Sequence, residues 1–108
     1  MYAFQLTEEE QILKKAMCAA HIGDKSGLGA LYLTTERVVF IGYERTAVTT
    51  TVEEEIPLEH IDEITAGKTL AILPNVVTIA TIRGRRFKFV INGRDDWIEA
   101  IRRQMDRI

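Results

Sequence analysis

The sequence predicts a mainly β domain that is closed by one C-terminal α-helix. Residues 28–91 repeatedly alternate in polarity and are rich in β-branched and aromatic side chains, which is typical of strands. Two pairs of these segments are separated by loops short enough for hairpins. Residues 95–107 instead combine a helical spacing of apolar side chains with charged residues on the opposite side.

The composition supports a single domain with its own hydrophobic core. Of the 108 residues, 46% are hydrophobic and 28% are charged, which excludes a disordered tail or a low-complexity repeat. The lone cysteine, Cys18, cannot form a disulfide within the chain, and no Cys/His cluster has the spacing of zinc ligands. We therefore expect no metal and no cofactor.

Charge is unevenly distributed along the chain. Fourteen Lys and Arg residues against sixteen Asp and Glu residues leave a net charge of -2, which argues against a dedicated nucleic-acid-binding protein. Residues 1–67 hold 5 basic and 12 acidic side chains, whereas residues 68–108 hold 9 and 4. Such a dipolar molecule could associate with itself or present a locally basic end, although two solvated faces of opposite charge are the simpler interpretation.

We expect a cytoplasmic protein, because the sequence carries no recognisable targeting segment. Its first residues run into Glu8-Glu9-Glu10, whereas a signal peptide begins with a basic leader. The most apolar stretch, residues 70–82, is interrupted by Pro74 and is shorter than the roughly 20 residues of a membrane-spanning helix.

The first hairpin is predicted from residues 28–34 and 37–43, which flank Thr35-Glu36. A two-residue loop pairs Leu33 with Val38 and Leu31 with Phe40, so that these four side chains share one face. The opposite face is apolar as well, and it contains Ala30, Tyr32, Val39, Ile41 and Tyr43.

The second hairpin is predicted from residues 76–82 and 85–91. A three-residue loop, with Gly84 at a left-handed bulge position, pairs Ile79 with Phe87 and Val77 with Phe89. A two-residue loop would separate these apolar residues, so the pattern favours the longer loop. The residues left for the outer face are Thr78, Ala80, Arg86 and Lys88.

Further strands are predicted over residues 52–58 and 61–67, with a loose loop through residues 68–75. The C-terminal helix is expected to be capped by Asp95 or Asp96. Its apolar side chains are expected to pack on the core, and they are Trp97, Ile98, Ile101, Met105 and Ile108.

The N-terminal segment is ambiguous from periodicity. Thr7 and Glu10 have the spacing of a capping box, and Leu13, Met17 and Ala20 have helical spacing. This pattern taken alone predicts a helix over residues 8–21.

Several short motifs occur in an order that resembles a known family. The segment Gly29-Ala-Leu-Tyr-Leu-Thr-Thr-Glu-Arg-Val-Val-Phe40 is similar to the signature hairpin of the GRAM and bacterial pleckstrin-homology-like (PH-like) domains. The other matching motifs are Glu10-Gln-Ile-Leu13, Ile56-Pro-Leu-Glu-His-Ile61, Leu73-Pro-Asn-Val-Val-Thr-Ile79, Phe87-Lys-Phe89 and the helix with Trp97. Thr35 departs from the pattern, because many relatives have Asn at this turn.

The resemblance implies a bacterial protein with a PH-like open barrel of seven antiparallel strands in two packed sheets, capped by one C-terminal α-helix. Residues 11–22 then form the first strand rather than a helix. The implied organisation is one domain over residues 1–108, with an N-terminal arm (1–10), a barrel (11–91) and a helix (95–107).

No catalytic motif is apparent, so we expect no enzymatic activity. His21 and His60 lie in no motif with a nucleophile or paired carboxylates, and Cys18 has no partner at a recognisable spacing.

Basic residues suggest an anion-binding or lipid-binding surface. In PH-like domains the loops equivalent to residues 22–27, 44–50 and 83–85 converge at the open end of the barrel. They would bring together Lys25, Arg45, Arg83 and Arg85, with Arg86 and Lys88 adjacent. Clustered guanidinium groups hold phosphate well, but the first loop has only one Lys, fewer than in the phosphoinositide-binding members.

The second apolar face of the first hairpin suggests a protein interface. One sheet face of a small open barrel normally meets water and should be polar. We therefore expect a protein-binding or self-associating module that uses Ala30, Tyr32, Val39, Ile41 and Tyr43, and peripheral binding to an anionic membrane surface is the alternative. The intramolecular alternative is that Tyr2, Phe4 and Leu6 of the arm cover this face.

Overall fold

One continuous antiparallel sheet curls around the core. A computed structural model describes residues 4–47, 49–70 and 72–108. The strands are β1 (Ile12–Ile22), β2 (Lys25–Thr34), β3 (Arg37–Glu44), β4 (Thr51–Pro57), β5 (Ile61–Thr69), β6 (Leu73–Thr81) and β7 (Arg86–Val90). A 3-10 turn, η1 (Leu58–His60), links β4 to β5, and the helix α1 (Arg94–Met105) follows β7.

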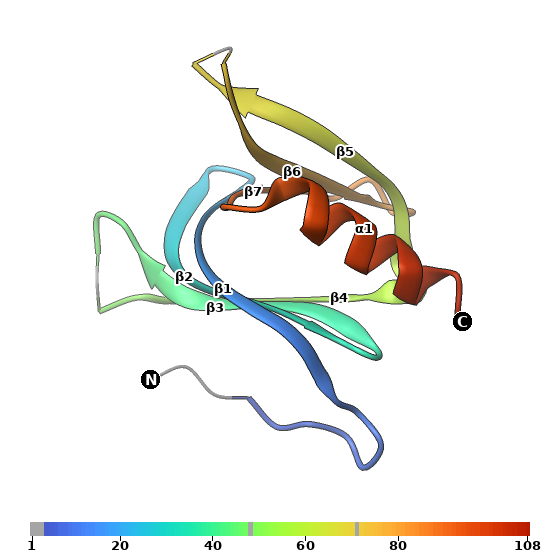
Figure 1. The fold of residues 1–108 in the computed structure, drawn as a ribbon. Helices are drawn as coiled ribbons and strands as arrows, with labels where there is room; N and C mark the ends of the chain where they lie inside the picture. The colour runs from blue at the N-terminus through green and yellow to red at the C-terminus, as the bar shows by residue number, and fades with distance from the viewer. Residues whose placement is uncertain (1–3, 48, 71) are drawn as a thin grey trace.

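The strand order explains the half-barrel shape. The order is β4-β3-β2-β1-β7-β6-β5, so β1 joins the two halves of the sheet by pairing with both β2 and β7. Figure 1 shows β1–β4 as one wall and β5–β7 as the other, with α1 across the open side. The predicted fold class is therefore confirmed, and the two packed sheets are the two halves of one curled sheet.

The N-terminal segment forms a strand, so the helix predicted from periodicity is wrong. Ala16, Cys18 and Ala20 point into the core, and β1 pairs along its length with β2. The pairing with two neighbouring strands outweighs the local helical pattern. Thr7 and Glu10 do interact, because the Thr7 amide donates to the Glu10 carboxylate (3.0 Å), but they close a turn before β1.

Both predicted hairpin registers are confirmed. In β2 and β3, Leu33 lies opposite Val38 and Leu31 opposite Phe40. The turn between them needs no Asn, since the Thr34 hydroxyl accepts hydrogen bonds from the amides of Glu36 and Arg37, both at 3.0 Å.

The hairpin of β6 and β7 has the expected three-residue loop. Thr81 donates its amide to the carbonyl of Arg85, and Gly84 has a φ of 86°. Ile79 lies opposite Phe87 and Val77 opposite Phe89. The left-handed backbone at Gly84 is why this position suits glycine.

Two local predictions are wrong. The loose loop expected over residues 68–75 is largely strand, because Thr69 pairs with Leu73 at the end of the β5–β6 hairpin. The helix begins after Gly93, which has a φ of 75° and provides no side-chain cap. Asp95 and Asp96 lie instead in the first turn, where their charge complements the helix dipole.

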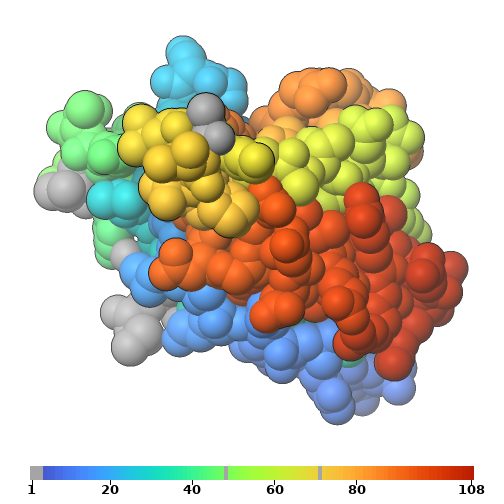
Figure 2. Space-filling view, turned by 45° about the horizontal axis from the view of Figure 1, so that its top comes forward, coloured from blue at the N-terminus to red at the C-terminus, as the bar shows by residue number. Residues whose placement is uncertain are grey.

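The helix closes the core with three of its predicted apolar residues. Trp97, Ile98 and Ile101 are buried among the inward-facing side chains of both walls, and Met105 packs at the edge. Ile108 is exposed, so its assignment to the core-packing face is wrong. Figure 2 shows α1 at the surface between the β5 region and the first residues of β1.

Candidate binding surface on the outer sheet face

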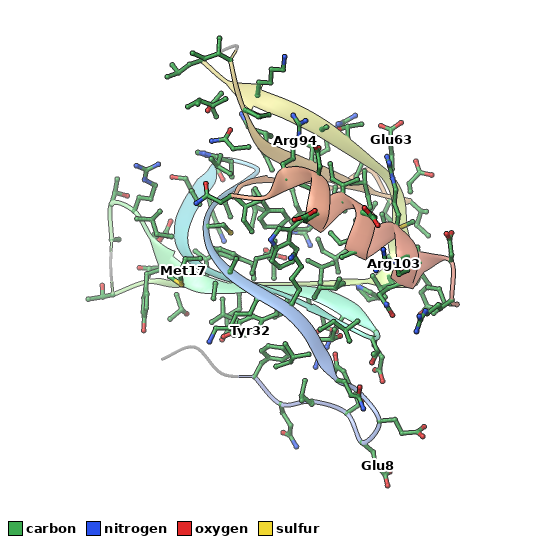
Figure 3. The ribbon with its side chains drawn as sticks, viewed as in Figure 1. Glu8, Met17, Tyr32, Glu63, Arg94 and Arg103 are labelled. Carbon is green, nitrogen blue, oxygen red and sulfur yellow. The ribbon has the colours of Figure 1, made fainter. Side chains whose placement is uncertain are left out.

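The apolar outer face of β2 and β3 is covered by the N-terminal arm. Ala30, Tyr32, Val39 and Ile41 are between 0% and 7% exposed and form a second apolar cluster, separate from the core. Phe4 packs on this cluster, with its ring edge-on to Tyr32 at a centroid distance of 4.9 Å. Figure 3 shows Tyr32 on the side of the sheet that faces the arm.

The arm therefore covers the buried part of this face, as the intramolecular alternative expects. Leu6 is 38% exposed, and Tyr2 lies outside the described residues. Tyr43, the fifth residue of the predicted interface, is 42% exposed. A partner can reach the other four residues only if the arm moves away.

A buried ion pair fastens the arm to the hairpin. The Glu10 carboxylate accepts hydrogen bonds from Arg37 Nε (2.7 Å) and Nη2 (2.9 Å), from the Thr34 hydroxyl and from the Thr7 amide. These bonds, chiefly those from Arg37, lower the pKa of Glu10 to about 2 although burial opposes the shift. Arg37 Nη2 also donates to the carbonyl of Gln5 (2.8 Å), which holds the arm in place.

Arg37 makes two further contacts that sequence reasoning missed. Its guanidinium carbon lies 5.1 Å from the centre of the Phe4 ring, and its Nη1 lies 3.0 Å from a carboxylate oxygen of Glu55. The signature motif includes this arginine, but its contacts with the arm depend on tertiary structure and could not be predicted from spacing.

Beyond the arm, the same face exposes three apolar side chains that we call the outer strip: Met17, Leu28 and Tyr43. The strand register brings them together, because Leu28 lies opposite Tyr43 and Met17 lies opposite Ala30, two residues along β2 from Leu28. Met17 is 62% exposed, Leu28 51% and Tyr43 42%. The strip therefore continues the covered apolar cluster into solvent.

Three of the predicted basic residues lie beside the outer strip, namely Arg45, Arg86 and Lys88. The amide of Arg45 bonds the carbonyl of Ser26 (3.1 Å), whereas Lys25 begins β2 opposite the core residue Ile22. Arg86 and Lys88 lie two residues apart on β7, and both are exposed. Lys88 is opposite His21 of β1, in the row next to Leu28 and Ala19.

The other two predicted basic residues face a different part of the molecule. Arg83 and Arg85 line a hollow of about 290 Å³ with Glu55, Pro57 and His60. Arg85 is paired with Glu54 at 3.2 Å, and its guanidinium lies over the Phe87 ring. The structure thus places Arg45, Arg86 and Lys88 beside the outer strip and groups Arg83 with Arg85, and a single convergent anion site remains a prediction.

Comparison with known proteins identifies the family. A sequence model of the GRAM domain matches residues 1–108. The chain belongs to the GRAM domain family. No curated protein matches its sequence.

Solved structures show the same fold. The C-terminal domain of an unknown protein from Leishmania infantum is similar, with a TM-score of 0.71, 21% identity and coverage of 89% of this chain and 84% of that one. The N-terminal PH domain of Vps36 is similar with a TM-score of 0.70, 11% identity and coverage of 95% and 84%. GRAM and PH-like domains are modules that often bind proteins or lipids.

Cys18, the single cysteine of this GRAM domain, is buried. Burial raises the pKa of the Cys18 thiol to about 12, so the thiol is a poor nucleophile at neutral pH. Across residues 4–47, 49–70 and 72–108, no three His, Cys, Asp or Glu side chains are grouped to hold a metal ion. The same residues include no helix long and apolar enough to cross a membrane.

Proposed function

We propose that this GRAM domain is a non-enzymatic module that binds a protein through the outer face of β1–β3. The observation that carries this proposal is the outer strip, where Met17, Leu28 and Tyr43 expose apolar surface beside an apolar cluster. An apolar patch with aromatic and Met side chains and a polar rim is characteristic of interface centres. Tyr43 is the member of the originally predicted interface that a partner can reach without displacing the arm.

The proposal is tested by capture from an extract of the source cell, using the wild type and Leu28→Glu as bait. Leu28 is exposed, so the substitution should leave the fold intact while placing a charge at the centre of the strip. The control is Leu13→Glu, because Leu13 is also exposed but lines a hollow beside α1.

We expect a partner that is retained by the wild type and by Leu13→Glu but lost with Leu28→Glu. The partner is then identified by mass spectrometry and rebound as a purified protein. Retention of every bound protein by Leu28→Glu would exclude the outer strip as the binding surface.

Peripheral binding to an anionic membrane surface is the second candidate. It is favoured by the exposed cations near the strip, namely Arg45, Arg86 and Lys88, and by the exposed Lys25 at the start of β2. Sedimentation with vesicles that contain or lack anionic lipid tests it. Binding that requires anionic lipid and is lost in Arg86→Glu/Lys88→Glu, but kept in Arg103→Glu on α1, would support this candidate, whereas equal partitioning of all variants would exclude it.

A further inference from the structure

We propose that the outer strip binds the outer strip of a second copy of the chain, giving a symmetric dimer. This inference rests on the proposed protein-binding function and names the partner. Its basis is the arrangement of charges around the strip, which is complementary to itself.

Cations border the strip on one side. The row of residues next to Ala19 and Leu28 consists of Lys88 of β7, His21 of β1 and Ser26 of β2. Arg45 follows at the end of β3, where its amide bonds the carbonyl of Ser26. Arg86 extends this border one position further along β7. Lys88 and Arg86 both lie on exposed positions.

Carboxylates border the strip on the other side. In β4, Glu53 lies opposite Ile41 and Glu55 lies opposite Val39, and both are exposed. Glu53 and Lys88 therefore lie on opposite sides of Leu28, both across the sheet and along the strands. Glu53 lies on the β4 side and one row closer to the arm, whereas Lys88 lies on the β7 side and one row further from the arm.

This diagonal arrangement suits a two-fold axis. Along the curled sheet, Lys88 is two strands from Leu28 on the β7 side and Glu53 is two strands from it on the β4 side, and each is one row away from Leu28 in opposite directions. An axis that runs obliquely across the strip places Lys88 of one copy opposite Glu53 of the other, and symmetry repeats the contact. An isologous interface requires such self-complementarity.

The charge distribution favours a second copy over a membrane. Residues 1–57, which carry β1–β4 and the strip, hold 5 basic and 9 acidic side chains, and an anionic surface would repel them. In a dimer the carboxylates of β4 instead meet the cations of β7. Three exposed side chains bury far less than the roughly 800 Å² per partner of a standard interface, so we expect weak association with a Kd of about 100 μM.

Sedimentation velocity from about 10 μM to about 1 mM tests the inference. The wild type should shift from 12.3 kDa toward twice that mass as concentration rises, and the shift should weaken in high salt. Leu28→Glu should stay monomeric, whereas Arg103→Glu, an exposed substitution on α1, should behave as the wild type. Circular dichroism confirms that each variant is folded.

Charge reversal makes the test specific. Lys88→Glu alone and Glu53→Lys alone should each weaken association at least tenfold, because like charges then meet twice across the axis. An equimolar mixture of these two variants should dimerise again, since every contact in the mixed dimer joins a lysine to a glutamate.

A monomeric wild type at about 1 mM would overturn the inference, and so would a mixture of the two single variants that fails to associate. If the wild type stays monomeric, but a captured partner protein is lost when Leu28 is replaced by Glu, only the second-copy inference is overturned. The proposed protein-binding function then stands. Binding to anionic vesicles by a protein that stays monomeric would likewise overturn the second-copy inference.

Discussion

Arg37 joins parts of the chain that are far apart in sequence. Its guanidinium bonds Glu10 and Gln5 of the arm and Glu55 of β4, and it stacks on Phe4. A carboxylate as buried as that of Glu10 is tolerated because four donors satisfy its oxygens. Removing one member of such a pair costs more than removing an exposed ion pair.

Glu10 should make the protein acid-sensitive. Its pKa is about 2 in the folded state and 4.5 without these contacts, so the ionised pair stabilises the fold above about pH 5. That stabilisation, on the order of 3 kcal/mol, is lost as pH falls from about 5 to about 2. Urea unfolding at several pH values should show a free energy of unfolding that decreases more steeply in this window for the wild type than for Glu10→Gln. Parallel pH profiles of the two proteins would contradict this role for Glu10.

At the residue level, sequence reasoning found partners but not their roles. The spacing of Thr7 and Glu10 predicts their contact, yet the pair closes a turn rather than a helix N-terminus. The pairing of Arg85 with Glu54 joins residues 31 positions apart, one just before β7 and the other in β4, and these two strands are not neighbours in the sheet. No local pattern encodes such a contact.

Among the elements, the β2–β3 hairpin depends on close contact between two glycines. A Cβ at Gly29 would lie 2.2 Å from the carbonyl oxygen of Ile41, and a Cβ at Gly42 would lie 2.3 Å from that of Leu28. Both contacts are with backbone atoms, so the strands themselves would have to separate.

Gly29→Ala should therefore lower the free energy of unfolding by about 3 kcal/mol, because the methyl group forces the paired strands apart. Thermal or urea denaturation measures this loss. Gly84→Ala is the comparison, since Gly84 has a positive φ but open space around it, and it should cost only about 1 kcal/mol. Equal losses in the two variants would argue against a steric requirement at Gly29.

The N-terminal arm acts as a cover whose main apolar contact is Phe4. Phe4→Ala should lower the free energy of unfolding by about 1–2 kcal/mol and expose the apolar cluster around Tyr32. Increased binding of an apolar fluorescent dye and urea denaturation measure the two effects. Leu6→Ala is the matched control, because Leu6 is more exposed and should change neither measurement appreciably. A Phe4→Ala protein that resembles this control would show that the arm is not held by its aromatic ring.

How well each element could be predicted depends on whether residues close to one another in the sequence determine its structure. The two hairpin registers could be predicted because only one register places all large apolar side chains on the core face. The extension of β5 and β6 could not, because its turn contains Leu70 at a φ of 52° rather than a glycine or asparagine. The first strand was predicted by family resemblance, against its own helical periodicity.

For the molecule as a whole, the candidate surface arises from curling one sheet so that its outer face remains apolar. The sequence indicated this face through Ala30, Tyr32 and Ile41, which turned out to lie beneath the arm. Met17 and Leu28 were missed, since their positions on the face depend on the register between β1 and β2. The charge asymmetry between residues 1–67 and 68–108 was visible in the sequence, but only the strand order places opposite charges on either side of the outer strip.

A dilution series of amide NMR spectra tests the central claim most directly, because it maps association onto individual residues. Between about 1 mM and about 20 μM, we expect amide signals to shift in and around the outer strip, at Met17, Leu28 and Tyr43, together with Glu53 and Lys88. Signals of α1 residues such as Arg103 should stay unchanged. Spectra that do not depend on concentration, or shifts confined to α1 or to the hollow lined by Arg83 and Arg85, would contradict association through this face.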